Sequence, residues 1–80
     1  MSEVVNLTLR LTGTIASRAR VPAGERVAVE MGTSIRQVLE QVGLRPEPSW
    51  VIVLDGRTSA LGERVTSNGE LHVFVRVAGG

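Results

Sequence analysis

Only one segment of this chain has the apolar spacing of an amphipathic helix, and that feature limits the fold more than any other. Apolar residues recur there at intervals of three and four positions, at Ile35, Val38, Leu39 and Val42. This spacing places them along one side of a helix, so the helix buries a single stripe. One apolar stripe needs a second layer to cover it, and the remaining apolar residues of the chain must supply that layer.

Residues at both ends of this segment have the chemistry of helix caps. Thr33 or Ser34 can accept a hydrogen bond from the first free N–H groups of the helix. Ser34 and Gln37 have the spacing of a capping box, in which each side chain bonds to the other residue's backbone N–H. Gly43 suits the left-handed position that ends a helix, and Leu44 is expected to fold back over the last turn. The following residues, Arg45-Pro46-Glu47-Pro48-Ser49, predict a loop, because each proline disfavours the α region in the residue before it.

The N-terminal part of the chain predicts a hairpin. Val4 to Leu11 alternates apolar and polar residues, as a half-buried strand does. Gly13 and the polar stretch 17–20 interrupt the alternation, so we expect no helix there, and residues 22–24, Pro-Ala-Gly, predict a turn. The alternation then resumes at Val27, Val29 and Met31, which predicts a second strand paired with the first.

The C-terminal part predicts two more strands. Trp50 to Leu54 is a continuous apolar run followed by the turn pair Asp55-Gly56. Residues 57–66 are less regular, and Leu61 and Val65 are the expected core contacts. A second turn, Ser67-Asn68-Gly69-Glu70, precedes the alternating residues 71–77. One face of this last strand is expected to carry Leu71, Val73, Val75 and Val77, and the other His72, Phe74 and Arg76.

Together these segments predict a two-layer α+β domain. A hairpin followed by a helix that crosses to a parallel strand packs the helix on one face of the sheet. We therefore expect a mixed sheet of four to five strands with one main helix on one face.

Composition excludes several kinds of chemistry. The 80 residues suffice for one small domain, and the absence of Cys rules out disulfides, thiolate metal sites and a Cys nucleophile within it. His72, the single histidine, has no ligand partners at suitable spacing, so we expect no metal site. The net charge is +1 and the charges are scattered, which argues against a nucleic-acid partner. Without a signal peptide or a membrane-spanning run, the expected location is the cytoplasm, with no membrane partner.

The order of elements, the alternating last strand and the ending Val77-Ala78-Gly79-Gly80 resemble the ubiquitin-like β-grasp superfamily. Within it, the chain most resembles the sulfur carriers of the MoaD/ThiS family, which serve molybdopterin and thiamine biosynthesis. The resemblance implies a β-grasp domain over residues 1–76 and a flexible tail over residues 77–80. The last ten residues also resemble the tail of ubiquitin, so a protein modifier remains an alternative.

In this family the working group is the C-terminal carboxylate, here that of Gly80. An α-carboxyl group has a pKa of about 3.5, so it is an anion at pH 7 and a poor electrophile. The resemblance implies that an E1-like enzyme adenylates Gly80 with ATP, and that sulfide or a persulfide donor converts it to a thiocarboxylate. A synthase would then accept the sulfur for cofactor, cysteine or thio-nucleoside biosynthesis. The chain itself is expected to bind no cofactor.

The resemblance also implies which residues meet the partners. Gly79 and Gly80 have no Cβ and can enter a narrow channel, and Ala78 is nearly as slim. The expected contact residues are Gly79, Ala78, Val77, Arg76, Phe74 and His72. Phe74 is either a partner anchor or covered by a loop, and Arg76 either steers the tail or is simply solvated.

The expected role is that of a non-enzymatic carrier, or of the non-catalytic small subunit of a synthase such as molybdopterin synthase, monomeric when free. Two alternatives stay open: a modifier that forms isopeptide bonds through Gly80, and a plain interaction module whose tail is never activated.

Overall fold

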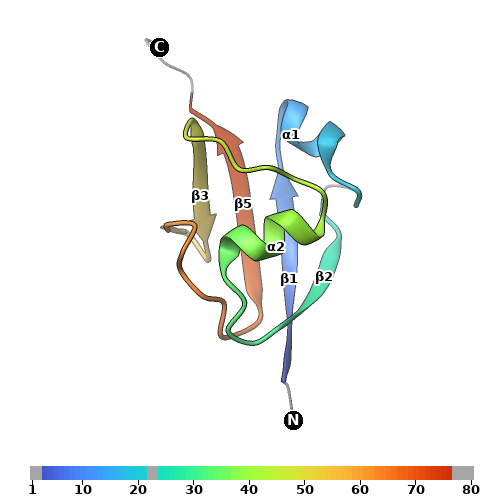
Figure 1. The fold of residues 1–80 in the computed structure, drawn as a ribbon, viewed down its shortest axis with the longest axis vertical. Helices are drawn as coiled ribbons and strands as arrows, with labels where there is room; N and C mark the ends of the chain where they lie inside the picture. The colour runs from blue at the N-terminus through green and yellow to red at the C-terminus, as the bar shows by residue number, and fades with distance from the viewer. Residues whose placement is uncertain (1–2, 22–23, 77–80) are drawn as a thin grey trace.

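A computed structural model describes residues 3–21 and 24–76 of the chain. The elements follow in the order β1 (Val4–Leu11), α1 (Gly13–Arg18), β2 (Arg26–Glu30), α2 (Ile35–Gln41), β3 (Trp50–Leu54), β4 (Arg57–Thr58) and β5 (Gly69–Val75). The strands form a five-stranded sheet in the order β2-β1-β5-β3-β4, and α2 crosses one face of it (Figure 1). The predicted mixed sheet with one main helix on one face is confirmed.

The two central strands, β1 and β5, run parallel, and their other neighbours are antiparallel to them. Because β2 and β3 are both antiparallel to this central pair, the connection through α2 joins two strands of the same direction, as predicted. Leu9 lies opposite Leu71, and Leu11 opposite Val73. These side chains are buried and pack with the apolar stripe of α2 in one core.

Both predicted caps of α2 are present. The Gln37 N–H donates to Ser34 Oγ, and the Ser34 N–H donates to Gln37 Oε1, each at 3.2 Å. At the other end, Gly43 has φ +85°, and the Leu44 N–H donates to the Leu39 carbonyl at 2.9 Å. With the bond from the Gly43 N–H to the Glu40 carbonyl, this completes a Schellman motif that buries Leu44.

The sequence prediction missed one helix. The segment from Gly13 to Arg18, where the sequence predicted no helix, forms the six-residue helix α1, whose Ile15 is only 1% exposed. A helix this short shows no apolar period and is marginal by itself in water, so its stability comes from packing Ile15 into the core. Six residues are too few for apolar residues to recur at helical spacing, so the sequence carries no signal for α1.

Two strand limits differ from the prediction. Met31 was expected in the second strand, but β2 ends at Glu30 and Met31 is 43% exposed. Gly32 follows with φ +91°, a conformation that turns the chain toward α2. The last strand spans Gly69–Val75 rather than 71–77, and Val75 is 40% exposed instead of joining the core. Val77 lies outside the described residues.

The two predicted turns differ in how they use glycine. Asp55 and Gly56 have φ of +52° and +80°, which confirms a two-residue turn between β3 and β4. Gly69, by contrast, does not adopt positive φ and begins β5. Its lack of a side chain matters because a Cβ there would fall on the Asp55 carboxylate.

Candidate functional site

The candidate site begins where β5 ends. Val75 lies opposite Trp50 at the start of β3, and the Arg76 N–H then donates to the Ser49 carbonyl at 2.9 Å. This bond extends the pairing of β5 by one residue to the edge of the described structure. We call Ser49, Val75 and Arg76 the tail root, because the predicted tail, residues 77–80, follows directly.

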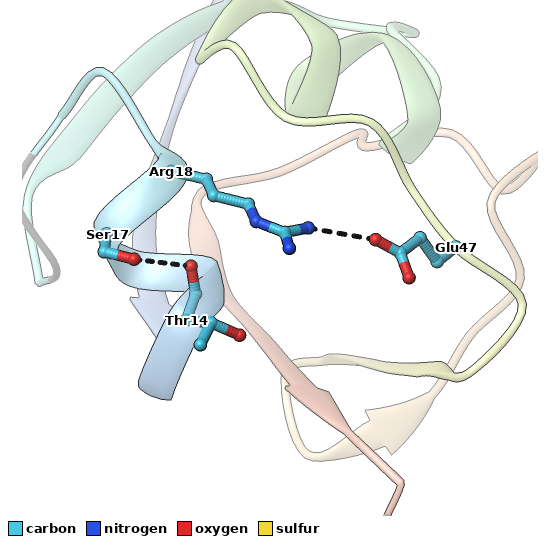
Figure 2. A network of polar contacts seen from close by, with 4 residues as sticks. All are labelled: Thr14, Ser17, Arg18 and Glu47. Atoms are coloured by element: carbon cyan, nitrogen blue, oxygen red, sulfur yellow. Dashed lines mark hydrogen bonds and ion pairs between the residues drawn. The ribbon is translucent and has the colours of Figure 1, made fainter.

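The loop beside the tail root is held on two sides. Arg18 of α1 reaches across to Glu47, with Nη1 and Oε2 3.0 Å apart, and Ser17 Oγ donates to the Thr14 carbonyl within α1 (Figure 2). The Arg20 N–H donates to the Val42 carbonyl at 2.8 Å, where the loop leaves α2. The Arg18–Glu47 pair is more than half exposed on the arginine side, so it orients the loop more than it stabilises the fold.

Arginine side chains gather around this loop. Arg18 and Arg45 line a surface hollow of about 450 Å³ together with Glu47, and the Arg20 side chain packs against Gly43. All of these charged side chains are exposed. Glu47 is the one acidic residue of the loop itself, so this end of the described structure presents an excess of positive charge.

The face of β5 opposite α2 carries His72 and Phe74. Leu71 and Val73 point into the core, so alternation along the strand turns His72 and Phe74 to the other face. Their ring centroids are 5.0 Å apart, with the planes tilted by 54°. Val53 of β3 lies opposite His72, and Val51 lies opposite Phe74. We call these four half-buried residues the open-face patch.

The described residues show what borders this patch. The buried residues of both helices, including Ile15 of α1, belong to the core on the other face of the sheet. On the open side, Arg10 lies opposite His72, and its Nε pairs with Glu70 Oε2 at 2.8 Å. An apolar and aromatic surface thus lies beside a charged pair, an arrangement found in protein-binding surfaces.

The structure brings together some of the predicted contact residues. His72 and Phe74 lie side by side on the predicted face, and Arg76 is exposed at the tail root. Val77, Ala78, Gly79 and Gly80 lie outside the described residues, so their roles stay predictions. The same holds for the boundary between a domain of residues 1–76 and a tail.

Sequence reasoning missed the residues that frame the tail root. Arg18 and Glu47 are 29 positions apart, and only the unpredicted helix α1 brings them together. Ser49 contributes only its backbone carbonyl, and the residue type of Ser49 does not indicate that contact. The one available signal was the pair of prolines at 46 and 48, which marks the loop as stiff.

Residues 3–21 and 24–76 hold no candidate metal site and no helix that could cross a membrane. This part of the chain holds no group of three or more His, Asp or Glu side chains placed to bind a metal ion. Neither of its two helices has the length and apolar character that crossing a membrane demands.

Comparison with known proteins bears on the fold. No family model matches the sequence, and no curated protein matches it. Among solved structures, the chain is similar to the crystal structure of SAMP1 from Haloferax volcanii, with a TM-score of 0.71 and 21% sequence identity. The similarity covers 94% of this chain and 99% of SAMP1. Together with the order of strands and the helix on one face, it shows that the chain has the ubiquitin-like β-grasp fold.

Proposed function

We propose that this chain is a sulfur carrier of the MoaD/ThiS type, acting in the cytoplasm through the carboxylate of Gly80. The observation that supports this most is the tail root: β5 ends at Val75, the Arg76 N–H still bonds to Ser49, and Val77-Ala78-Gly79-Gly80 follow in the sequence. Four extended residues span about 13 Å, enough to reach into a partner's active site while the folded domain stays outside.

The proposed chemistry needs an activating enzyme of the E1 type. The Gly80 carboxylate attacks the α-phosphorus of ATP, which gives an acyl adenylate and releases pyrophosphate. Hydrosulfide then attacks the acyl carbon and displaces AMP, leaving a thiocarboxylate. With a persulfide donor the first product is an acyl disulfide, whose S–S bond a thiol cleaves. A synthase finally accepts the sulfur.

In this proposal the folded domain serves as the recognition surface. Phe74 and His72 of the open-face patch are the anchors for the activating enzyme, because their ring faces are only half-buried and adjoin two valines. Arg76 steers the tail by pairing with a carboxylate of the enzyme. Catalytic groups belong to the enzyme, and the carrier contributes the acyl group.

A second candidate is a protein modifier, joined through Gly80 to lysines of target proteins. The similarity to SAMP1 extends over nearly the full length of both proteins and supports this candidate as well as the first, because both candidates use the same fold. Both candidates begin with the same acyl adenylate. They differ in whether sulfur or an amine takes the acyl group.

Intact-mass measurement of the protein from its native cell separates the two candidates. A sulfur carrier is expected to show a fraction with one oxygen replaced by sulfur, located at Gly80 by fragmentation. A modifier is expected to appear as Gly80-linked adducts on lysines of other proteins. A variant that lacks Gly79-Gly80 is the control and should show neither product. If all of the wild-type protein carries an unmodified carboxylate and no adducts exist, both candidates fail.

A further inference from the structure

The strand β2 lies at one edge of the sheet (Figure 1). Its hydrogen bonds to β1 show which of its backbone groups face the sheet and which face outward. The Leu9 N–H donates to the Glu25 carbonyl, and the Met31 N–H donates to the Glu3 carbonyl. Antiparallel pairs alternate between bonded and non-bonded positions, so the odd-numbered residues of β2 bond to β1. The backbone groups of Arg26, Ala28 and Glu30 therefore point away from the sheet.

The described residues leave this edge uncovered. Arg26, Ala28 and Glu30 are exposed, and a groove of about 640 Å³ lies between β2 and α2. Among the ion pairs formed by described residues, none includes Arg26 or Glu30. The Glu30 carbonyl accepts a bond from the Thr33 N–H at 3.1 Å in the turn that follows β2. The edge still offers the backbone groups of Arg26 and Ala28 and the Glu30 N–H, flanked by one positive and one negative side chain, as a template for a further strand.

We propose that β2 pairs in an antiparallel manner with β2 of a second copy of this chain. The two copies are related by a two-fold axis that passes between their Ala28 residues, which we call the axis through Ala28. Ala28 lies opposite its own symmetry mate, and the two residues exchange both backbone hydrogen bonds. Arg26 lies opposite Glu30 of the second copy, and Glu30 opposite its Arg26. In each of these pairs the Glu30 N–H donates to the Arg26 carbonyl, while the Glu30 carbonyl keeps its bond to Thr33. Each pair also places opposite charges on the same face of the joined sheet.

The charge pattern selects this register over its neighbours. A two-fold axis through Arg26 or through Glu30 would place like charges opposite each other, which is unfavourable. An axis through Val27 or Val29 would pair Ala28 with one charged residue and form no ion pair. Only the axis through Ala28 uses both charges, and Ala28 is also the middle of Arg26–Glu30. The strand is therefore complementary to itself, as a two-fold interface requires.

The pairing replaces the expected monomer with a weak, reversible dimer, because one short strand buries less than the ~1,200 Å² typical of stable interfaces. The axis is perpendicular to the sheet, so the two tail roots lie at opposite ends. The two open-face patches lie on the same face, with their β5 strands about 24 Å apart across five strand spacings. This inference does not depend on the proposed function, since the tail takes no part.

Variants with reversed charges test the pairing. Sedimentation equilibrium of the full chain, at protein concentrations up to about 1 mM, measures the dimer dissociation constant of each variant. R26E and E30R each place like charges opposite each other in both symmetric pairs and are expected to weaken dimerisation about tenfold. The double variant R26E/E30R restores opposite charges and should return close to the wild-type dissociation constant. The control is R36E, which makes the same change of charge as R26E but on the exposed side of α2. It should leave the dissociation constant of the dimer unchanged.

Amide hydrogen exchange gives a second measurement on the wild type. The Ala28 N–H points to solvent in the monomer and is bonded in the dimer, so its exchange should slow as concentration rises. The proposal is overturned if sedimentation shows no dimer up to that concentration, if the double variant is as weak as the single ones, or if Ala28 exchange does not depend on concentration.

Discussion

At the scale of single residues, Asp55 and Gly69 show how two turns stabilise each other. The Asp55 N–H donates to the Glu70 carbonyl at 2.9 Å, and the Glu70 N–H donates to Asp55 Oδ1 at 2.8 Å. These reciprocal bonds tie the turn after β3 to the start of β5. The carboxylate lies where a Cβ of Gly69 would be, so glycine is needed there for space and not for backbone conformation.

We therefore predict that Gly69→Ala lowers the free energy of unfolding by about 1 kcal/mol, because the new Cβ displaces the Asp55 carboxylate and breaks its bond to Glu70. Thermal or denaturant unfolding measures the change. Gly62→Ala is the matched control, since a Cβ there meets no atom within 4 Å and its stability should be unchanged or slightly raised. Equal stabilities of the two variants would show that Asp55 and Gly69 do not compete for space.

At the scale of elements, what the sequence reveals depends on length and on local chemistry. The apolar stripe and the caps of α2 were predictable from their spacing and residue types, and the strand Trp50–Leu54 from an apolar run that ends at the turn pair Asp55-Gly56. The helix α1 and the two-residue strand β4 were not, since both are too short to show a period. The helix α1 owes its structure to contacts with distant segments, whereas β4 only extends the hairpin that begins with β3. The frame of the tail root depends on α1.

The helix α1 should therefore depend on Ile15 most among its side chains, because Ile15 is its one buried residue and Ala16 is only partly buried. We predict that Ile15→Ala lowers the free energy of unfolding by about 2–5 kcal/mol, the cost of a buried cavity. Removing Arg18 or Glu47 should cost less than about 1 kcal/mol, since their ion pair is exposed. Denaturant unfolding measures the loss in the free energy of unfolding for each variant, Ile15→Ala, Arg18→Ala and Glu47→Ala. A larger loss from Arg18→Ala than from Ile15→Ala would contradict the assignment of Ile15 as the anchor.

At the scale of the whole molecule, the fold separates two surfaces. The core lies between α2 and one face of the sheet, and the open-face patch and the tail root lie outside it. The patch could be predicted in part, because alternation in the last strand places His72 and Phe74 together. Its partners Val51 and Val53 could not, because they lie in a continuous apolar run whose faces the sequence does not distinguish.

If the patch is a docking surface, its loss should affect partner binding more than the fold. We predict that Phe74→Ser raises the KM for activation by the adenylating enzyme about tenfold with little change in kcat, because an apolar anchor is lost. Phe74→Leu keeps apolar volume and should stay close to wild type. Steady-state kinetics with each variant as the substrate measures both constants. Wild-type KM in Phe74→Ser would exclude this face as the docking surface.

The most direct measurement of the central claim is ATP–pyrophosphate exchange, because reversible adenylation of Gly80 returns label from pyrophosphate to ATP. With an extract of the native cell freed of its own copy of this chain, added wild-type protein should stimulate exchange. The variant lacking Gly79-Gly80 should not, although its thermal unfolding should match the wild type, since β5 and the core end before the tail. Equal exchange with both proteins, or none with either, would contradict the account.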